Sequence, residues 1–342
     1  MLSSNNQQSD PEYIRHDFLV DANQSKLRVD KFIADRIAKI SRNKIQDAIN
    51  GGLVRVNEKL VKANFKVKPG DKVQVLSFEE PEEFHVEPEN IPINIIYEDE
   101  DVVIVNKAPN MVVHPGVGNF TGTLLNALYF YYRKEMEVGK VQPVLVHRID
   151  KDTSGLLVVA KNEIAVNHLA QQFKEHSIQR KYWALVWGTL DKHRGTVVGN
   201  IGRSLKDRKK FTVFTDPEMG KQAITHYKLL EDFQFTSLIE CQLETGRTHQ
   251  IRVHMKHIGH TLFNDAFYGG DKILKGVVFS KYRQFVENTF SILPRQALHA
   301  KSLGFVHPST KEAMFFESDL APDFVDGLNK WKNMVQNQSF KT

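Results

Sequence analysis

HRIDKDTSGLLVVAK, residues 147–161, places charged side chains, a turn and an apolar run within one segment. The apolar run, Leu156 to Ala160, is short and continuous, which is typical of a strand that is buried on both faces. The turn before it has suitable residue types at Asp152 to Gly155. We therefore expect Asp150 at the mouth of a buried strand, where a rigid scaffold would hold an ionised carboxylate beside Arg148. The alternative is that Asp150 only caps the turn and that Arg148 is solvated.

The chain is long enough for two domains and contains a single cysteine. Its 342 residues can bury full-sized hydrophobic cores without stabilisation by disulfide bonds. Because Cys241 is alone, an internal disulfide and a thiolate zinc cluster are excluded, which favours a reducing compartment and a cytoplasmic location. Residues 1–10 are polar, and no apolar run is long enough to cross a bilayer. Neither secretion nor membrane insertion is expected.

The positive charge of the chain is clustered. The net charge is only +5, but basic residues gather at Lys26 to Lys44, Arg203 to Lys210 and Arg247 to Lys256. Clusters of this kind favour a polyanionic partner such as a nucleic acid.

The N-terminal quarter predicts a polar lead and a small basic domain. Residues 1–17 are rich in Ser, Asn, Gln and Asp and predict a disordered lead. Residues 26–76 predict two short helices, the second capped by Ser41 and ended by Gly51-Gly52, followed by short strands. This order resembles the S4-like RNA-binding domain of a ribosomal protein. Such domains grip structured RNA through its backbone, so the resemblance implies RNA-binding roles for basic residues on the polar faces, namely Arg28, Lys31, Arg42 and Lys44. The alternative is a solvated pair of helices.

An acidic, proline-bearing segment at residues 77–91 predicts a linker to a second domain at residues 92–335. In that domain we expect mostly antiparallel strands with helices between them, including an inserted basic hairpin at residues 191–228. A helix with Ile251 and Met255 inward would carry Arg252 near its start. The expected fold class is therefore α+β, with a small S4-like domain before a domain that has a mixed, mainly antiparallel sheet.

Three long motifs carry a resemblance to a known family. HRIDKDTSGLL at 147–157, RKYWALVWG at 180–188 and TGRTHQIRVH at 245–254 occur in the order and spacing of the RluA-type pseudouridine synthases. The likeness covers about residues 18–330, and it implies that residues 92–335 form a pseudouridine synthase catalytic domain. One departure is Ile149, where the family usually has Leu; this conservative change puts little in doubt.

The resemblance implies roles for three residues. Asp150 matches the catalytic aspartate, Tyr182 the active-site tyrosine, and Arg252 the basic residue that pairs with the aspartate. Enzymes of this family break the N-glycosidic bond of a uridine, turn the uracil and join its C5 to the same sugar carbon. A buried carboxylate stays charged only when it is paired, which suits Arg252 beside Asp150. Whether Asp150 attacks the sugar, attacks the base or draws a sugar proton stays open. A plain core tyrosine is the alternative for Tyr182.

The resemblance also implies an RNA partner. Arg148 is the candidate to fill the gap when the target uridine flips out of its stack, because guanidinium planes stack on bases. Further RNA-binding candidates are the basic residues Arg203, Arg208, Lys209 and Arg247. The implied substrate is ribosomal RNA of the large subunit, a monomer is expected, and neither a metal nor an organic cofactor is implied.

The sequence also has features of three other functions. A metal site formed by histidines among residues 249–260 conflicts with Arg247, Arg252 and Lys256, because cations repel a cation. A phosphate-binding loop at residues 116–123 lacks the lysine before its threonine. An RNA-binding protein without catalysis is the serious alternative, since basic modules need no active site.

Overall fold

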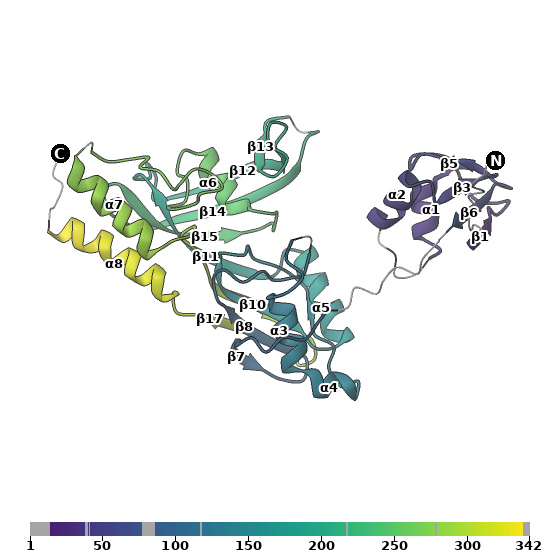
Figure 1. Cartoon of the computed structure of the whole chain (residues 1–342), viewed down its shortest axis with the longest axis horizontal. Helices are drawn as coiled ribbons and strands as arrows, with labels where there is room; N and C mark the ends of the chain where they lie inside the picture. Colours follow the sequence, from purple (N-terminus) through teal and green to yellow (C-terminus); the bar gives the residue numbers. More distant parts are fainter. Residues whose placement is uncertain are drawn as a thin grey trace, which may run out of the picture. The chain divides into compact units, whose positions relative to one another are not determined.

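The computed structural model describes residues 14–37, 40, 42–76, 86–116, 118–216, 218–277 and 279–337. These residues divide into two units, Met1–His85 and Val86–Thr342, with separate hydrophobic cores (Figure 1). Residues 1–13 of the expected lead, residues 77–85 of the expected linker and the expected cap Ser41 lie outside the described residues.

Two short helices pack against small antiparallel sheets in the N-terminal unit, as the sequence predicts. The buried side chains of Phe32 and Ile33 on α1 and of Ile45 on α2 supply much of its core. One sheet has the order β1-β6-β3-β4, and the other pairs β2 with β5. The elements are α1 (Val29–Ala34), α2 (Arg42–Asn50), β1 (Ile14–Leu19), β2 (Leu27–Arg28), β3 (Val54–Val56), β4 (Lys59–Leu60), β5 (Lys66–Val67) and β6 (Lys72–Leu76).

The prediction of a disordered lead is wrong for residues 14–17. They form the first part of β1, which pairs with β6. Phe18 on the same strand contacts the ring of buried Phe32 at a centroid distance of 6.2 Å. Local composition did not reveal this strand, because its partner lies more than fifty residues further along the chain.

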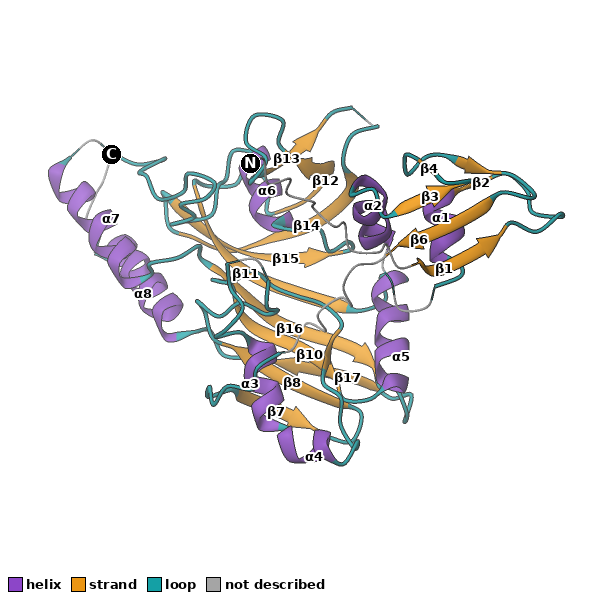
Figure 2. Cartoon of the chain, turned by 45° about the vertical axis from the view of Figure 1, so that its right-hand side comes forward, coloured by secondary structure: helices purple, strands orange, loops and turns teal. Residues whose placement is uncertain are grey.

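The second unit is built on one 11-stranded sheet, seen as a continuous run of strands in Figure 2. The strand order is β13-β12-β14-β15-β11-β16-β10-β8-β7, with β17 beside β16 and β9 beside β10. Among the described residues only β10 and β16 pair in parallel, which confirms the predicted mixed, mainly antiparallel sheet. The strands are β7 (Asn94–Glu98), β8 (Val102–Lys107), β9 (Val144–Leu145), β10 (Ser154–Ala160), β11 (Gln179–Trp187), β12 (Arg194–Arg203), β13 (Phe211–Phe214), β14 (Lys221–Asp232), β15 (Thr236–Leu243), β16 (Leu298–Val306) and β17 (Ala313–Glu317).

Six helices are described in this unit. Helices α7 and α8 lie side by side (Figure 2), and their buried side chains Tyr282 and Trp331 share a hydrophobic core with residues of β11 and β15. The side chain of Asn162 caps α5 by accepting a hydrogen bond from the backbone of Ala165, as the sequence predicts. The helices are α3 (Leu124–Tyr131), α4 (Arg133–Glu137), α5 (Glu163–Lys174), α6 (Gln250–His257), α7 (Ser280–Ile292) and α8 (Pro322–Gln336).

Strand β10 holds the loop that carries Asp150. All of its residues are buried, in agreement with the apolar run in the sequence. Gly155 has φ +109°, and a Cβ at this position would lie 2.3 Å from the carbonyl oxygen of Ala300 on β16. Only glycine therefore permits the close parallel pairing of β10 and β16 directly after the loop.

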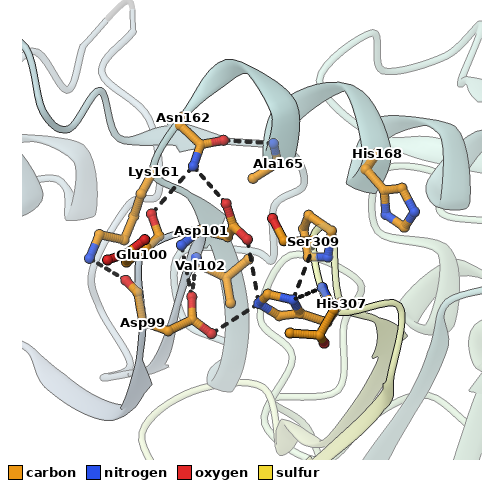
Figure 3. Close-up of polar contacts among 12 residues, drawn as sticks. Asp99, Glu100, Asp101, Val102, Lys161, Asn162, Ala165, His168, His307 and Ser309 are labelled. Carbon is orange, nitrogen blue, oxygen red and sulfur yellow. Dashed lines mark hydrogen bonds and ion pairs between the residues drawn. The ribbon is translucent and has the colours of Figure 1, made fainter.

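The other end of β10 is anchored by polar contacts with the β7–β8 turn (Figure 3). His307 Nε2 lies 3.0 Å from Asp99 Oδ2, and Asn162 donates to Asp101 Oδ1 at 2.8 Å. Lys161 forms an ion pair with Glu98 at 2.7 Å. These contacts join the C-terminal end of β10 to the β7–β8 turn, at the end of the strand away from the Asp150 loop.

Candidate active site

The three motifs meet around one cavity of about 310 Å³. Asp150 and Arg148 line it from the loop before β10, and Tyr182 lines it from β11. Arg252 lines it from the start of α6, and Arg247 from the segment before that helix. These residues lie up to about a hundred positions apart in the sequence, so only the fold brings them together.

Arg252 is held between two carboxylates. Its Nη1 donates to Asp150 Oδ2 at 2.8 Å, while its Nε and Nη2 donate to the two oxygens of Asp265 at 2.7 and 2.8 Å. Burial opposes the charge of the guanidinium, but the hydrogen bonds and charges of Asp265 and Asp150 raise the pKa of Arg252 above its usual value. The guanidinium therefore stays positive and keeps one side of Asp150 in place.

The second oxygen of Asp150, Oδ1, is less restrained, and Asp150 lines the cavity. Among the described residues no hydrogen bond reaches Asp150 Oδ1, and His249 Nε2 lies 3.9 Å from it. The side chain of Asp150 is 18% exposed, whereas that of Asp265 is 1% exposed. One carboxylate oxygen is thus fixed by Arg252, and the other is available to a bound molecule.

Asp265 was not singled out in the sequence. It lies in an irregular segment after α6, where no periodic pattern marks it. Its contacts are made 13 positions back along the chain, with Arg252, and locally with the backbone of Tyr268. A lone aspartate between Asn264 and Ala266 gives no signal of this pairing.

Tyr182 lies on β11 with its ring at the cavity. Its side chain is buried, and this burial is the main cause that raises the pKa of Tyr182. The charge of Arg180 lowers the pKa, and the charge of Asp150 raises it further. The phenol therefore stays protonated at neutral pH. A neutral phenol can stack on a base or donate a hydrogen bond, but it is a weak proton acceptor.

His249 is a second residue that the sequence did not assign to this site. It adopts a left-handed backbone conformation with φ 56°, and its Nδ1 lies 2.8 Å from the hydroxyl of Tyr268. The pKa of His249 is lowered, mainly because the imidazole is buried. The charge of Asp150 raises this pKa, and the charge of Arg252 lowers it. The imidazole is therefore neutral at neutral pH. It lines the cavity, and its ring contacts the rings of Phe211 and Phe267.

Known proteins match this chain over both units. The family of RNA pseudouridylate synthases matches residues 101–257, which contain all three motifs, and S4 domains match residues 27–73. An RNA pseudouridine synthase of Bacillus subtilis is 44% identical to this chain and aligns over 91% of it and 96% of the relative. The chain belongs to the RNA pseudouridine synthases. It is therefore an isomerase, and the fold class and family predicted from the sequence are confirmed.

Two further known proteins are similar to this pseudouridine synthase. The ribosomal large subunit pseudouridine synthase D of Zymomonas mobilis is 40% identical over 86% of the chain and 91% of the relative. The solved structure of human RNA pseudouridylate synthase domain containing 4 aligns with a TM-score of 0.54 over 70% of this chain and 93% of its own. Since that structure is 23% identical, it supports the fold alone.

The predicted RNA-binding residues of the synthase domain lie in two places. Arg148 is exposed at the cavity, and Arg247 lines the same cavity while donating to the carbonyl of Gln222 at 3.1 Å. Three others are exposed at the end of β12 and in the turn after it, namely Arg203, Arg208 and Lys209. Arg203 and Arg247 also line an adjoining cleft of about 540 Å³, so the basic turn is connected to the active-site cavity.

Two of the four basic candidates in the S4-like unit bind a buried acid. Arg28 and Arg42 both donate to Asp30, whose side chain is fully buried, and Gln46 does so as well. Burial alone would raise the pKa of Asp30, but the hydrogen bonds from Arg28, Gln46 and Arg42 lower it. These guanidinium groups therefore support the fold as well as the charge of the surface. Lys31 and Lys44 are exposed.

Two of the histidines between residues 249 and 260 form hydrogen bonds within the protein. His254 contacts Thr225 and His260 contacts the carbonyl of Trp187, each at hydrogen-bonding distance. Within the described ranges, no group of three or more His, Cys, Asp or Glu side chains is arranged to hold a metal ion.

None of the helices in the described part of the chain combines the length and the apolar character that a membrane span requires.

Proposed function

We propose that this enzyme isomerises uridines in large-subunit ribosomal RNA, with Asp150 as its catalytic carboxylate. The observation that carries the proposal is the 2.8 Å pairing of Asp150 with Arg252 in the wall of the cavity that Tyr182 also lines. The proposed substrate is supported by relatives that are named for the large ribosomal subunit and are about 40% identical over most of their length.

The side chains of the cavity suit the isomerisation of a uridine. The reaction breaks the bond between N1 and the sugar carbon C1′, joins C5 to C1′, and transfers the proton of C5 to solvent while N1 gains one. Asp150 acts as a nucleophile or base at the nucleoside, with Arg252 as the positively charged partner of its carboxylate. The neutral ring of Tyr182 stacks on the uracil, and the enclosing walls retain the detached base.

RNA is held by basic residues on both units. Arg148 fills the space that the flipped uridine leaves, because a guanidinium plane can stack on the neighbouring bases. Arg247 and the turn that carries Arg208 and Lys209 contact phosphates near the cavity. The S4-like unit at residues 26–76 contributes Arg28, Lys31, Arg42 and Lys44 to RNA selection, and residues 92–335 perform the chemistry.

We further propose a cytoplasmic monomer that needs no metal or organic cofactor. The isomerisation requires neither an oxidant nor a group donor, so protein side chains suffice for it. The lone Cys241 is buried, and burial raises the pKa of its thiol well above the usual value, so that it is unreactive in a reducing compartment.

Release of tritium from C5 of uracil tests the proposed reaction. With large-subunit ribosomal RNA labelled at this atom, we expect the enzyme to release label to water in proportion to the pseudouridine formed, even with a chelator present. Small-subunit ribosomal RNA serves as the matched control and should release far less label. Equal release from both RNAs would contradict the proposed substrate, and a need for added divalent metal would contradict the proposed chemistry.

A further inference from the structure

Two buried cations hold the backbone directly after Asp150. Lys107 Nζ donates to the carbonyl oxygen of Lys151 at 2.9 Å, and Arg295 Nη1 donates to that of Asp152 at 2.8 Å. Lys107 is 1% exposed and Arg295 is 7% exposed. Charges are rarely buried unless they are paired or fully hydrogen-bonded, and here the partners of both side chains include backbone carbonyls of the Asp150 loop.

Lys107 connects three segments of the chain. It is the last residue of β8, opposite Gly155 on β10, and Nζ also donates to the carbonyls of Ala108 and Met111 at 2.6 and 2.9 Å. Within the described residues no carboxylate lies within 4.0 Å of Nζ. The three N–H groups of a charged lysine are thus matched by three backbone carbonyls.

Arg295 connects the same loop to the C-terminal helix. Its Nε and Nη2 donate to both oxygens of Asp323 in the first turn of α8, at 2.6 and 2.9 Å. Nη2 also contacts the hydroxyl of Ser154, the first residue of β10, at 3.2 Å. The bidentate pair with Asp323 fixes the plane of the guanidinium, which fixes the direction of its bond to the carbonyl of Asp152.

We propose that Lys107 and Arg295 are positioning residues that hold the Asp150 loop for catalysis. This proposal rests on the proposed catalytic role of Asp150. Arg252 restrains the carboxylate, but among the described residues no hydrogen bond joins it to the backbone of residues 151–153, where the loop has one backbone hydrogen bond of its own, from Thr153 to the carbonyl of Asp150 at 3.1 Å. The two cations restrain the carbonyls of Lys151 and Asp152 in addition, and a loop displaced by a fraction of an ångström would move Asp150 Oδ1 away from the nucleoside.

The restraint by Lys107 depends on pH. Burial, and then the charge of Arg295, lower the pKa of Lys107 to about 7, while Asp152 and Asp150 act in the opposite direction. When the amine loses its proton as the pH rises, two N–H groups remain for three carbonyls. Turnover by the unaltered enzyme should therefore fall on the alkaline side of neutrality.

Lys107→Met tests the positioning role, with Lys161→Met as its matched control. Lys161 is another buried lysine that follows the far end of β10. It donates to Glu98 and to the backbone carbonyl of Asp99, of which the second contact is seen in Figure 3. In single turnover at saturating RNA, we expect Lys107→Met to be about 100-fold slower, with RNA affinity within about twofold and without the alkaline decline. Lys161→Met should lower the melting temperature but keep the rate. Arg295→Lys, which retains the charge, should lose less activity than Arg295→Met.

Wild-type and Asp150→Asn proteins in the same assay separate the two proposals. If Asp150→Asn is inactive while Lys107→Met reacts at the normal rate, only the positioning proposal is overturned. If Asp150→Asn reacts normally, the proposed role of Asp150 fails first. Should Lys107→Met not fold, a wild-type rate that is constant from neutral to alkaline pH, together with normal turnover by Arg295→Met, would overturn the positioning role.

Discussion

Asp150→Asn should form pseudouridine at least about 10³-fold more slowly than the unaltered enzyme while binding RNA normally. The amide keeps the shape of the side chain and can still accept from Arg252, but it has lost the negative charge that the reaction uses. A thousandfold loss corresponds to about 4 kcal/mol of transition-state stabilisation. The measurement is the single-turnover rate with saturating RNA, together with the RNA dissociation constant.

Asp99→Asn is the matched control for this substitution. Asp99 is also partly buried and also faces a basic side chain, His307, but it lies beyond the far end of β10. Hydrogen bonds from the backbone of Val102 and Asp101 and from Tyr97, together with the charge of His307, lower the pKa of Asp99 although burial opposes them. Its replacement should therefore reduce stability and leave the rate unchanged. A folded Asp150→Asn protein that reacts at the normal rate would refute the catalytic role of Asp150.

Asp265→Asn should slow the reaction about 100-fold without changing RNA affinity. The bidentate contact with Asp265 occupies Nε and Nη2 of Arg252, so only Nη1 reaches Asp150. Without that anchor the guanidinium can turn and bind both oxygens of Asp150, which would occupy Oδ1, the oxygen that accepts no hydrogen bond among the described residues. Because one partner of a buried ion pair is lost, stability should also fall by about 3 kcal/mol or more, measured by chemical unfolding.

The double variant Asp150→Asn with Asp265→Asn tests whether Asp265 acts through Asp150. If it does, the double variant should be no slower than Asp150→Asn alone, because the residue that Asp265 positions is already inactive. Losses that multiply would show that Asp265 contributes to the rate by a separate route.

The sequence was most informative where chemistry and local pattern coincide. The apolar run after Asp150 predicted the buried strand β10, and the motifs predicted that Asp150, Tyr182 and Arg252 share a site; the structure brings all three to one cavity.

Residues whose role depends on distant partners were missed. Asp265 and Arg295 lie in irregular segments, and Lys107 ends an ordinary strand, so no periodicity marks them. Likewise, the count of basic residues in the S4-like unit did not reveal that Asp30 is buried beneath Arg28 and Arg42. Helices α3 and α7 were not predicted either, and the expected inserted hairpin proved to be strands β12 to β14 of the main sheet. Pairings of this kind are set by tertiary packing, which a single sequence does not display.

The proposed function is tested most directly by mapping pseudouridine in ribosomal RNA from cells that lack this protein. We expect specific positions of the large-subunit RNA to remain uridine in those cells. Expression of the unaltered enzyme should restore pseudouridine there, and equal expression of the Asp150→Asn variant should not. A map that is unchanged by loss of the protein, or that is restored by Asp150→Asn, would contradict the account.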